Sequence, residues 1–226
     1  MKNKNNITEI VFILDRSGSM GGLESDTIGG FNSMLRDQKK KEGKAFVSTV
    51  LFDHESIVLH DRIPVENVPE MTDSDYTVRG CTALLDAIGD AVKHIGNIHK
   101  YARPEDVPEK TIFIITTDGM ENSSRHYGYD EVRRMIERQK ERYNWEFMFL
   151  GANIDAVKEA GRFGINPSRA VRYEHDSVGT SLNYDVVSHV VGRARKAATA
   201  ADMNALFDDE EMLAPIREDY KKRHRK

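Results

Sequence analysis

The hydrophobic and polar positions of this chain follow two patterns, one typical of buried strands and the other of amphipathic helices. Nearly continuous apolar runs, typical of strands covered on both faces of a sheet, occupy residues 10–14, 44–52, 111–116 and 147–150. Between and after these runs, apolar residues recur three and four positions apart. This period predicts helices over about 24–41, 84–98, 128–142, 154–163 and 178–203.

The alternation of strands and helices predicts an α/β fold, in which a doubly wound, mostly parallel sheet carries helices on both faces. The turn at 53–56 leads into a run at 57–60, which we expect to pair antiparallel with the preceding strand at the edge of the sheet. A further short strand is expected near 170–173. No linker divides this pattern, so we expect one domain over residues 1–203 and a charged tail over 204–226, frayed or disordered.

Composition narrows the class of protein. The 226 residues carry a net charge of −4, which argues against non-specific binding to nucleic acid. No apolar run approaches the roughly 20 residues that a membrane-spanning helix needs, and the apolar stretch that stops at Asp15 is too short for a signal peptide. The single cysteine, Cys81, cannot form an internal disulfide, which favours a reducing compartment. We therefore expect a cytoplasmic protein that binds neither membrane nor nucleic acid.

Oxygen-bearing side chains stand where three predicted loops meet the sheet. Asp15, Ser17 and Ser19 follow the first apolar run at alternate positions. Thr82 precedes the second predicted helix, and Asp118 follows the run at 111–116. Because ligands of an open parallel sheet bind at the carboxyl ends of its strands, these two carboxylates and three hydroxyls converge if the strands are neighbours. Hard oxygen ligands of this kind predict a site for a small divalent cation such as Mg²⁺.

The three motifs together resemble the von Willebrand factor type A (vWA) domain with an intact metal-ion-dependent adhesion site (MIDAS), over residues 7–203. The motifs are Asp-x-Ser-x-Ser at 15–19, Gly-x-Thr-Ala-Leu at 80–84 and Thr-Asp-Gly at 117–119. The resemblance implies a Rossmann-like fold with six strands in the order 3-2-1-4-5-6 and an antiparallel edge strand 3. It also implies a bound Mg²⁺, with Mn²⁺ or Ca²⁺ as alternatives. Ser17, Ser19 and Thr82 would bind the ion directly or nearly so, and Asp15 and Asp118 directly or through water.

The resemblance further implies a binding module and not an enzyme. In the family, an Asp or Glu carboxylate of a partner protein typically completes the coordination of the metal. The lack of a signal peptide points to the bacterial intracellular type, whose members act as adaptors, often beside AAA+ ATPases. The family also switches between closed and open forms by shifting its last helix, for which the predicted helix over 178–203 is the candidate here.

Other interpretations of these residues stay open. A metal-dependent hydrolase or phosphatase would use the same cation as a Lewis acid, but it needs a general base, and the three loops offer only His126. A vestigial site is a third possibility, and each ligand taken alone is an ordinary helix cap or turn residue. Zinc is not expected, because the histidines lack the spacing of a zinc motif. Arg16, Arg79 and Arg125 are expected at the rim of the metal loops, either meeting an acidic partner or solvated.

Overall fold

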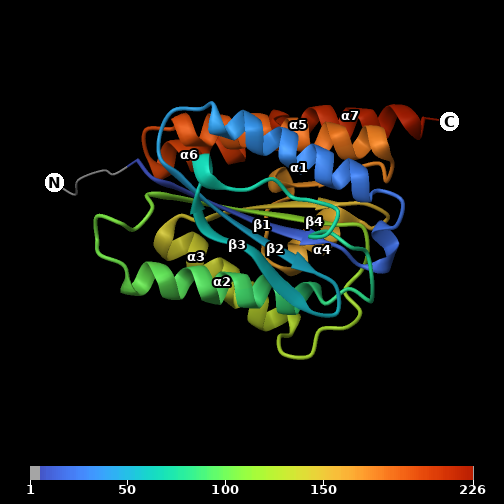
Figure 1. Ribbon diagram of the computed structural model, residues 1–226, viewed down its shortest axis with the longest axis horizontal. Coiled ribbons are helices and arrows are strands. Elements are labelled where there is room, and N and C mark those ends of the chain that lie inside the picture. Colours follow the sequence, from blue (N-terminus) through green and yellow to red (C-terminus); the bar gives the residue numbers. More distant parts are fainter. Residues whose placement is uncertain (1–5, 226) are drawn as a thin grey trace.

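The computed structural model describes residues 6–225 as a six-stranded sheet between two layers of helices (Figure 1). The strands are β1 (Thr8–Asp15), β2 (Ala45–Phe52), β3 (Ser56–Pro64), β4 (Lys110–Thr117), β5 (Glu146–Gly151) and β6 (Ala170–Arg172). The α-helices are α1 (Glu24–Lys39), α2 (Leu84–Tyr101), α3 (Tyr129–Tyr143), α4 (Ala156–Arg162), α5 (Ser177–Lys196), α6 (Ala200–Asp208) and α7 (Ala214–Arg223). Short 3₁₀ turns are η1 (Gly18–Met20), η2 (Val65–Asn67), η3 (Pro167–Arg169) and η4 (Glu210–Leu213).

The strands lie in the order β3-β2-β1-β4-β5-β6, and each neighbouring pair is parallel except β2 and β3. This arrangement confirms the predicted α/β class, the strand order and the antiparallel edge strand. The central strands β1 and β4 have a neighbour on each side and helices on both faces, which explains why their sequences are almost continuously apolar.

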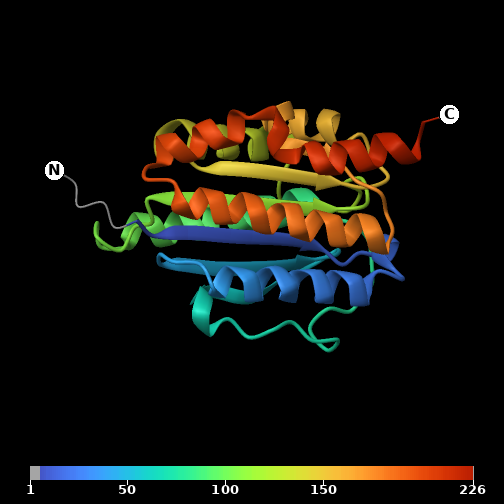
Figure 2. The same ribbon diagram turned by 90° about the horizontal axis from the view of Figure 1, so that it is seen from above.

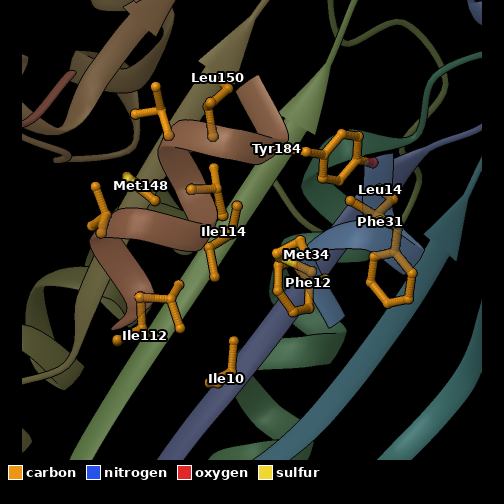
Figure 3. Packing of buried hydrophobic residues seen from close by; sticks show 14 of the residues in the cluster. Ile10, Phe12, Leu14, Phe31, Met34, Ile112, Ile114, Met148, Leu150 and Tyr184 are labelled. Atoms are coloured by element: carbon orange, nitrogen blue, oxygen red, sulfur yellow. The ribbon is translucent and has the colours of Figure 1, made fainter. Parts of the chain in front are cut away.

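Successive residues of β1 belong to two hydrophobic cores. Ile10, Phe12 and Leu14 face α1, α5, α6 and α7, whereas Val11 and Ile13 face α2, α3 and α4. Figure 2 shows α1 and α5 side by side over the first of these faces. Figure 3 shows how side chains of β1, β4 and β5 meet those of α1 and α5 in that core. The helices therefore hold the strands in register from both sides.

Helix α5 is shorter than the helix predicted over 178–203, because its carboxyl end is capped at residue 197. The ammonium group of the fully buried Lys110 donates to the carbonyl oxygens of Arg195 and Ala197, at 2.7 and 2.8 Å. These bonds satisfy carbonyl groups that a helix end leaves without partners. Thr199 then begins α6 as its N-cap, so one predicted helix becomes two.

The same end of α5 is tied to the connection between α1 and β2 by the guanidinium of Arg195. This group is buried, and it donates to four backbone carbonyl oxygens at 2.6–3.4 Å, those of Gln38, Lys41, Glu42 and Gly43. In addition, the side-chain amide of Gln38 donates to the carbonyl of Ser188 at 2.9 Å. The carboxyl-terminal part of α5, from Ser188 to Arg195, is thus fixed to the end of α1 and to the segment that precedes β2.

The expectation of a frayed or disordered tail from residue 204 is wrong for the described part of that segment. Helices α6 and α7 pack onto the core, and they and η4 bury Met203, Phe207, Met212, Leu213 and Ile216. The guanidinium of Arg169, also buried, donates to the carboxylates of Glu146 at 2.6 Å and Asp208 at 2.9 Å. Buried apolar residues therefore anchor this segment to the core, although most of its sequence is charged.

The carboxyl ends of the parallel strands lie along one edge of the sheet, at the right in Figure 2. This edge is where the sequence predicts the metal site. None of the described helices is both long enough and apolar enough to cross a bilayer.

Candidate metal centre

The first loop of the site follows β1 and is wrapped tightly around the carboxylate of Asp15. Asp15 is 1% exposed, and its Oδ1 accepts the backbone N–H of Ser17 at 2.7 Å. The turn η1 then brings the hydroxyls of Ser17 and Ser19 within 3.0 Å of each other. Ser17 is buried whereas Ser19 is exposed, so the loop leads from the interior to the surface.

The loop after β4 brings the second carboxylate to the same place. The hydroxyl of Ser19 donates to Oδ1 of Asp118 at 2.6 Å, and that of Thr117 donates to Oδ2 of Asp15 at 2.6 Å. A β-carbon added to Gly119 would lie 3.3 Å from Oγ1 of Thr82 and 3.4 Å from Oγ of Ser19. The hydroxyls of Thr82 and Ser19 therefore flank the same glycine. The structure brings all five predicted ligands, Asp15, Ser17, Ser19, Thr82 and Asp118, into one cluster.

Thr82 is positioned by the loop that follows Asp118. Its backbone N–H donates to Oδ1 of Asn122 at 2.9 Å, and its carbonyl accepts the N–H of Asn122 at 3.0 Å. The preceding residue of the same loop, Glu121, accepts the N–H of Leu85 at 2.9 Å and so caps the first turn of α2. These bonds join two ligand-bearing loops into one unit, a role for Asn122 that motif spacing did not predict.

We expect Asn122→Ala to weaken metal binding about tenfold, because outer residues that orient metal ligands typically contribute 10–100-fold to affinity. Calorimetric titration of a divalent cation into EDTA-stripped protein measures this change. The matched variant Asn122→Asp keeps an acceptor for the Thr82 N–H and should retain most of the affinity. Equal affinities of Asn122→Ala and the wild type would show that Thr82 needs no support from this loop.

Electrostatically, the cluster holds buried negative charge. Burial raises the pKa of Asp15 from 3.8 to about 6, against the lowering effect of hydrogen bonds from Thr117 and Ser17, and the nearby Asp118 adds a smaller upward shift. The side chain of Asp118 is fully buried, and its Oδ2 has no hydrogen-bond partner. A buried carboxylate is costly unless a cation faces it, and Nε2 of His175 lies 2.9 Å from this oxygen.

The cluster fits a divalent cation on the chemistry of its donors. Two carboxylates and three hydroxyls are hard oxygen ligands of the type that Mg²⁺, Mn²⁺ and Ca²⁺ bind. Over residues 6–225, no three His, Cys, Asp or Glu side chains gather as a metal site. The hydroxyls are therefore essential to this donor set.

One residue of the site was missed by sequence reasoning. Nε2 of His175 lies 2.9 Å from Oδ2 of Asp118, and the ring is 21% exposed. His175 belongs to the connection between β6 and α5, a fourth loop at the carboxyl edge of the sheet. Its position directly after a predicted strand was the available signal, but a strand of three residues makes a weak pattern.

Of the three arginines expected at the rim, Arg16 is not there. It is 4% exposed, and its Nε lies 3.0 Å from Oδ2 of the buried Asp53. Arg79 is half-exposed and donates to the same oxygen at 2.8 Å. Arg125 is exposed, while its backbone N–H donates to Asp86 at 2.8 Å. Arg16 therefore forms an internal ion pair, whereas Arg79 and Arg125 are exposed to solvent, and their contact with a partner stays a prediction.

Comparison with known proteins defines the class of fold. No protein-family model matches the chain, and no curated protein matches it. Among solved structures, the pilus adhesin SpaC of Lactobacillus rhamnosus GG matches with a TM-score of 0.62 and 11% identity, over 82% of this chain and 30% of that one. The vWF domain of the type V pili tip protein Mfa5 of Porphyromonas gingivalis matches with a TM-score of 0.58 and 9% identity, over 82% and 95%.

A third match is proximal thread matrix protein 1 of the mussel byssus, in a structure with a zinc-occupied MIDAS motif. Its TM-score is 0.56 and its identity 14%, over 85% of this chain and 47% of that one. The chain spans less than half the length of the first solved structures it matches. At these identities the likeness concerns the fold, which is vWA-like, with the six-stranded mixed sheet and strand order described above.

Proposed function

We propose that this protein is a metal-dependent protein-binding module, which captures an Asp or Glu carboxylate of a partner protein through a divalent cation. The observation that carries the proposal is the convergence of Asp15, Ser17, Ser19, Thr82 and Asp118 at the carboxyl edge of the sheet. These residues come from three separate loops, and Ser19 and its neighbour Gly18 are exposed. The cluster therefore reaches the surface at a point where an outside ligand has access.

The charge balance supports capture of a carboxylate. Two aspartates neutralise a divalent cation only formally, and hydroxyls contribute no charge, so the ion retains affinity for a further anionic ligand. Mg²⁺ takes six oxygens and readily keeps positions for ligands from outside the protein. We propose Mg²⁺ as the cation, with Mn²⁺ or Ca²⁺ as alternatives. By analogy of fold, two matched structures support the proposal, one described as a pilus adhesin and the other as having a zinc-occupied MIDAS.

The cellular location, the origin and the partner of the protein are inferred from the sequence alone. Cys81 is exposed and unpaired, in keeping with the reducing compartment that the cysteine count predicts. A cytoplasmic location, a bacterial intracellular origin and a partner associated with an AAA+ ATPase stay predictions.

Selection of peptides tests this function directly. A random peptide library displayed on phage is bound to the immobilised protein with Mg²⁺ or Mn²⁺ and eluted with EDTA. We expect the eluted peptides to share an Asp or Glu, and their Asn or Gln counterparts to lose binding. The variant Ser17→Ala should capture none of them while keeping the circular dichroism of the wild type. Peptides that bind equally in EDTA, or that share no acidic residue, would exclude this mechanism.

A metal-dependent hydrolase is the alternative function, and one observation favours it. His175 stands beside Asp118, where a hydrolase would need a general base close to its metal. Turnover of p-nitrophenyl phosphate with Mn²⁺, lost in His175→Gln, would support the enzyme. A rate equal to that of the Ser17→Ala variant would reject it for this substrate class.

A further inference from the structure

His175 is held in place from both ends of its loop. On one side, the N–H of Tyr173 donates to the carbonyl of Gly151 at 3.1 Å, which extends the pairing of β6 with β5. On the other, Asp176 is the N-cap of α5, and its carboxylate accepts the N–H of Gly179 at 2.7 Å. The carboxylate of Asp176 also receives a hydrogen bond from the guanidinium of Arg223 in α7. Hydrogen bonds on both sides of His175 therefore fix the loop from which its imidazole reaches the site.

The imidazole of His175 stands at ion-pair distance from the carboxylate of Asp118. Nε2 and Oδ2 are 2.9 Å apart, yet neither atom has a hydrogen-bond partner among the described residues. Adjacent ligands of one ion, each about 2.1 Å from it, stand roughly 3 Å apart when they subtend a right angle. The Oγ atoms of Ser17 and Ser19, which are hydrogen-bonded to each other, have the same spacing of 3.0 Å. At this spacing, Nε2 of His175 and Oδ2 of Asp118 are placed to bind one cation as neighbouring ligands.

We propose that His175 is a nitrogen ligand of the metal at this site and shifts its preference from Mg²⁺ toward an ion that accepts imidazole, with Zn²⁺ as the representative. This inference rests on the metal site of the proposed function and adds one ligand to it. Imidazole suits Zn²⁺ and other late first-row ions, whereas sites made only of carboxylates, hydroxyls and water suit Mg²⁺ and Ca²⁺. Asp118 and His175 supply the carboxylate and the imidazole of this assignment, and the hydroxyl of Ser19 lies 2.6 Å from Oδ1 of Asp118. The expectation that zinc is excluded rested on sequence motifs, which a single histidine from a fourth loop does not form.

The test compares the affinities of the EDTA-stripped full chain for Zn²⁺ and Mg²⁺ by calorimetric titration. The variants are His175→Ala, His175→Gln, which keeps a polar side chain, and His126→Ala as the matched control. His126 is an exposed histidine on the loop after β4, and its backbone N–H donates to Asp86 at 2.9 Å. We expect the ratio of Zn²⁺ to Mg²⁺ affinity to fall at least tenfold in both His175 variants and to stay unchanged in His126→Ala.

A spectroscopic measurement identifies the ligand atom itself. Electron spin-echo spectra of the Mn²⁺-loaded wild type should show modulation from the ¹⁴N of an imidazole, and His175→Gln should lack it. An unchanged Zn²⁺ to Mg²⁺ ratio, tighter Zn²⁺ binding in His175→Ala, or ¹⁴N modulation that survives in His175→Gln would each overturn the assignment. If Ser17→Ala abolishes metal binding and the His175 variants leave it unchanged, the proposed function stands without this assignment. Failure of the wild type to bind any of these ions would overturn both.

Discussion

In EDTA-treated protein at pH 8, Asp15→Asn should raise the free energy of unfolding by up to about 3 kcal/mol, and it should abolish stabilisation by metal. The pKa of this carboxyl is raised from 3.8 to about 6, chiefly by burial, and one pKa unit corresponds to about 1.4 kcal/mol. An asparagine can still accept the N–H of Ser17, and its amide can donate to Thr117 in place of the present bond. The substitution therefore removes a buried charge without leaving unpaired groups.

The pH dependence of this effect has a defined sign. Because the pKa of Asp15 is higher in the folded protein, the group stabilises the fold fully below about pH 3.8 and loses that contribution as pH rises through about 6. The difference in free energy of unfolding between Asp15→Asn and the wild type should thus grow as the pH rises from about 4 to about 6. Denaturant unfolding across this range measures it, with the exposed Asp73→Asn as control. A less stable Asp15→Asn protein at pH 8 would mean that the ionised carboxylate is compensated within the fold.

Phe207→Ala should lower the free energy of unfolding by about 3–5 kcal/mol, the usual cost of emptying a fully buried phenylalanine site. Phe207 is 0% exposed and belongs to the core between the sheet and α5, although it lies in the segment expected to be a tail. The control is Tyr101→Ala, since Tyr101 is an aromatic residue near a helix end but is 78% exposed. Urea unfolding should show little change in this control.

Truncation after residue 203 extends the same test. It removes four buried apolar side chains, those of Phe207, Met212, Leu213 and Ile216, and leaves Arg169 with only one of its two carboxylate partners. We expect the truncated chain to be unfolded or aggregated at 37 °C. A truncated protein with the thermal midpoint of the full chain would show that residues 1–203 fold independently, as the sequence pattern predicts.

The sequence could predict those parts of the fold in which many neighbouring residues follow the same hydrophobic pattern. Strands β1 and β4 are buried on both faces, so their sequences are continuously apolar and do not show the periodicity of an amphipathic helix. The convergence of the five candidate ligands could be predicted because a strand end followed by alternate hydroxyls, and a Thr-Asp-Gly turn after another strand, place their side chains at the same edge of the sheet. The packed structure supplied only the hydrogen bonds that bring them together.

The features that sequence missed depend on long-range contacts. His175 lies 57 positions after Asp118 and follows a strand of three residues. Arg16 looks like a surface residue of a metal loop, and only the buried Asp53 at the end of β2 explains its burial. In residues 204–223, charges outnumber apolar residues, so local composition hid the helical spacing of the side chains that anchor the segment. Each error reflects a tertiary contact that overrides a local preference.

The anchoring of α5 has a mechanical consequence for how such a site is controlled. In a helix-shift switch, the last helix slides along its axis, and one turn of an α-helix is about 5.4 Å. Here such a slide would break the four carbonyl contacts of Arg195 and both Lys110 bonds, all of which lie at the carboxyl end of the helix. We therefore expect the conformation of the site to stay fixed. Its affinity for a partner should depend on the concentration of metal and on the partner's acidic side chain, and not on a displacement of α5.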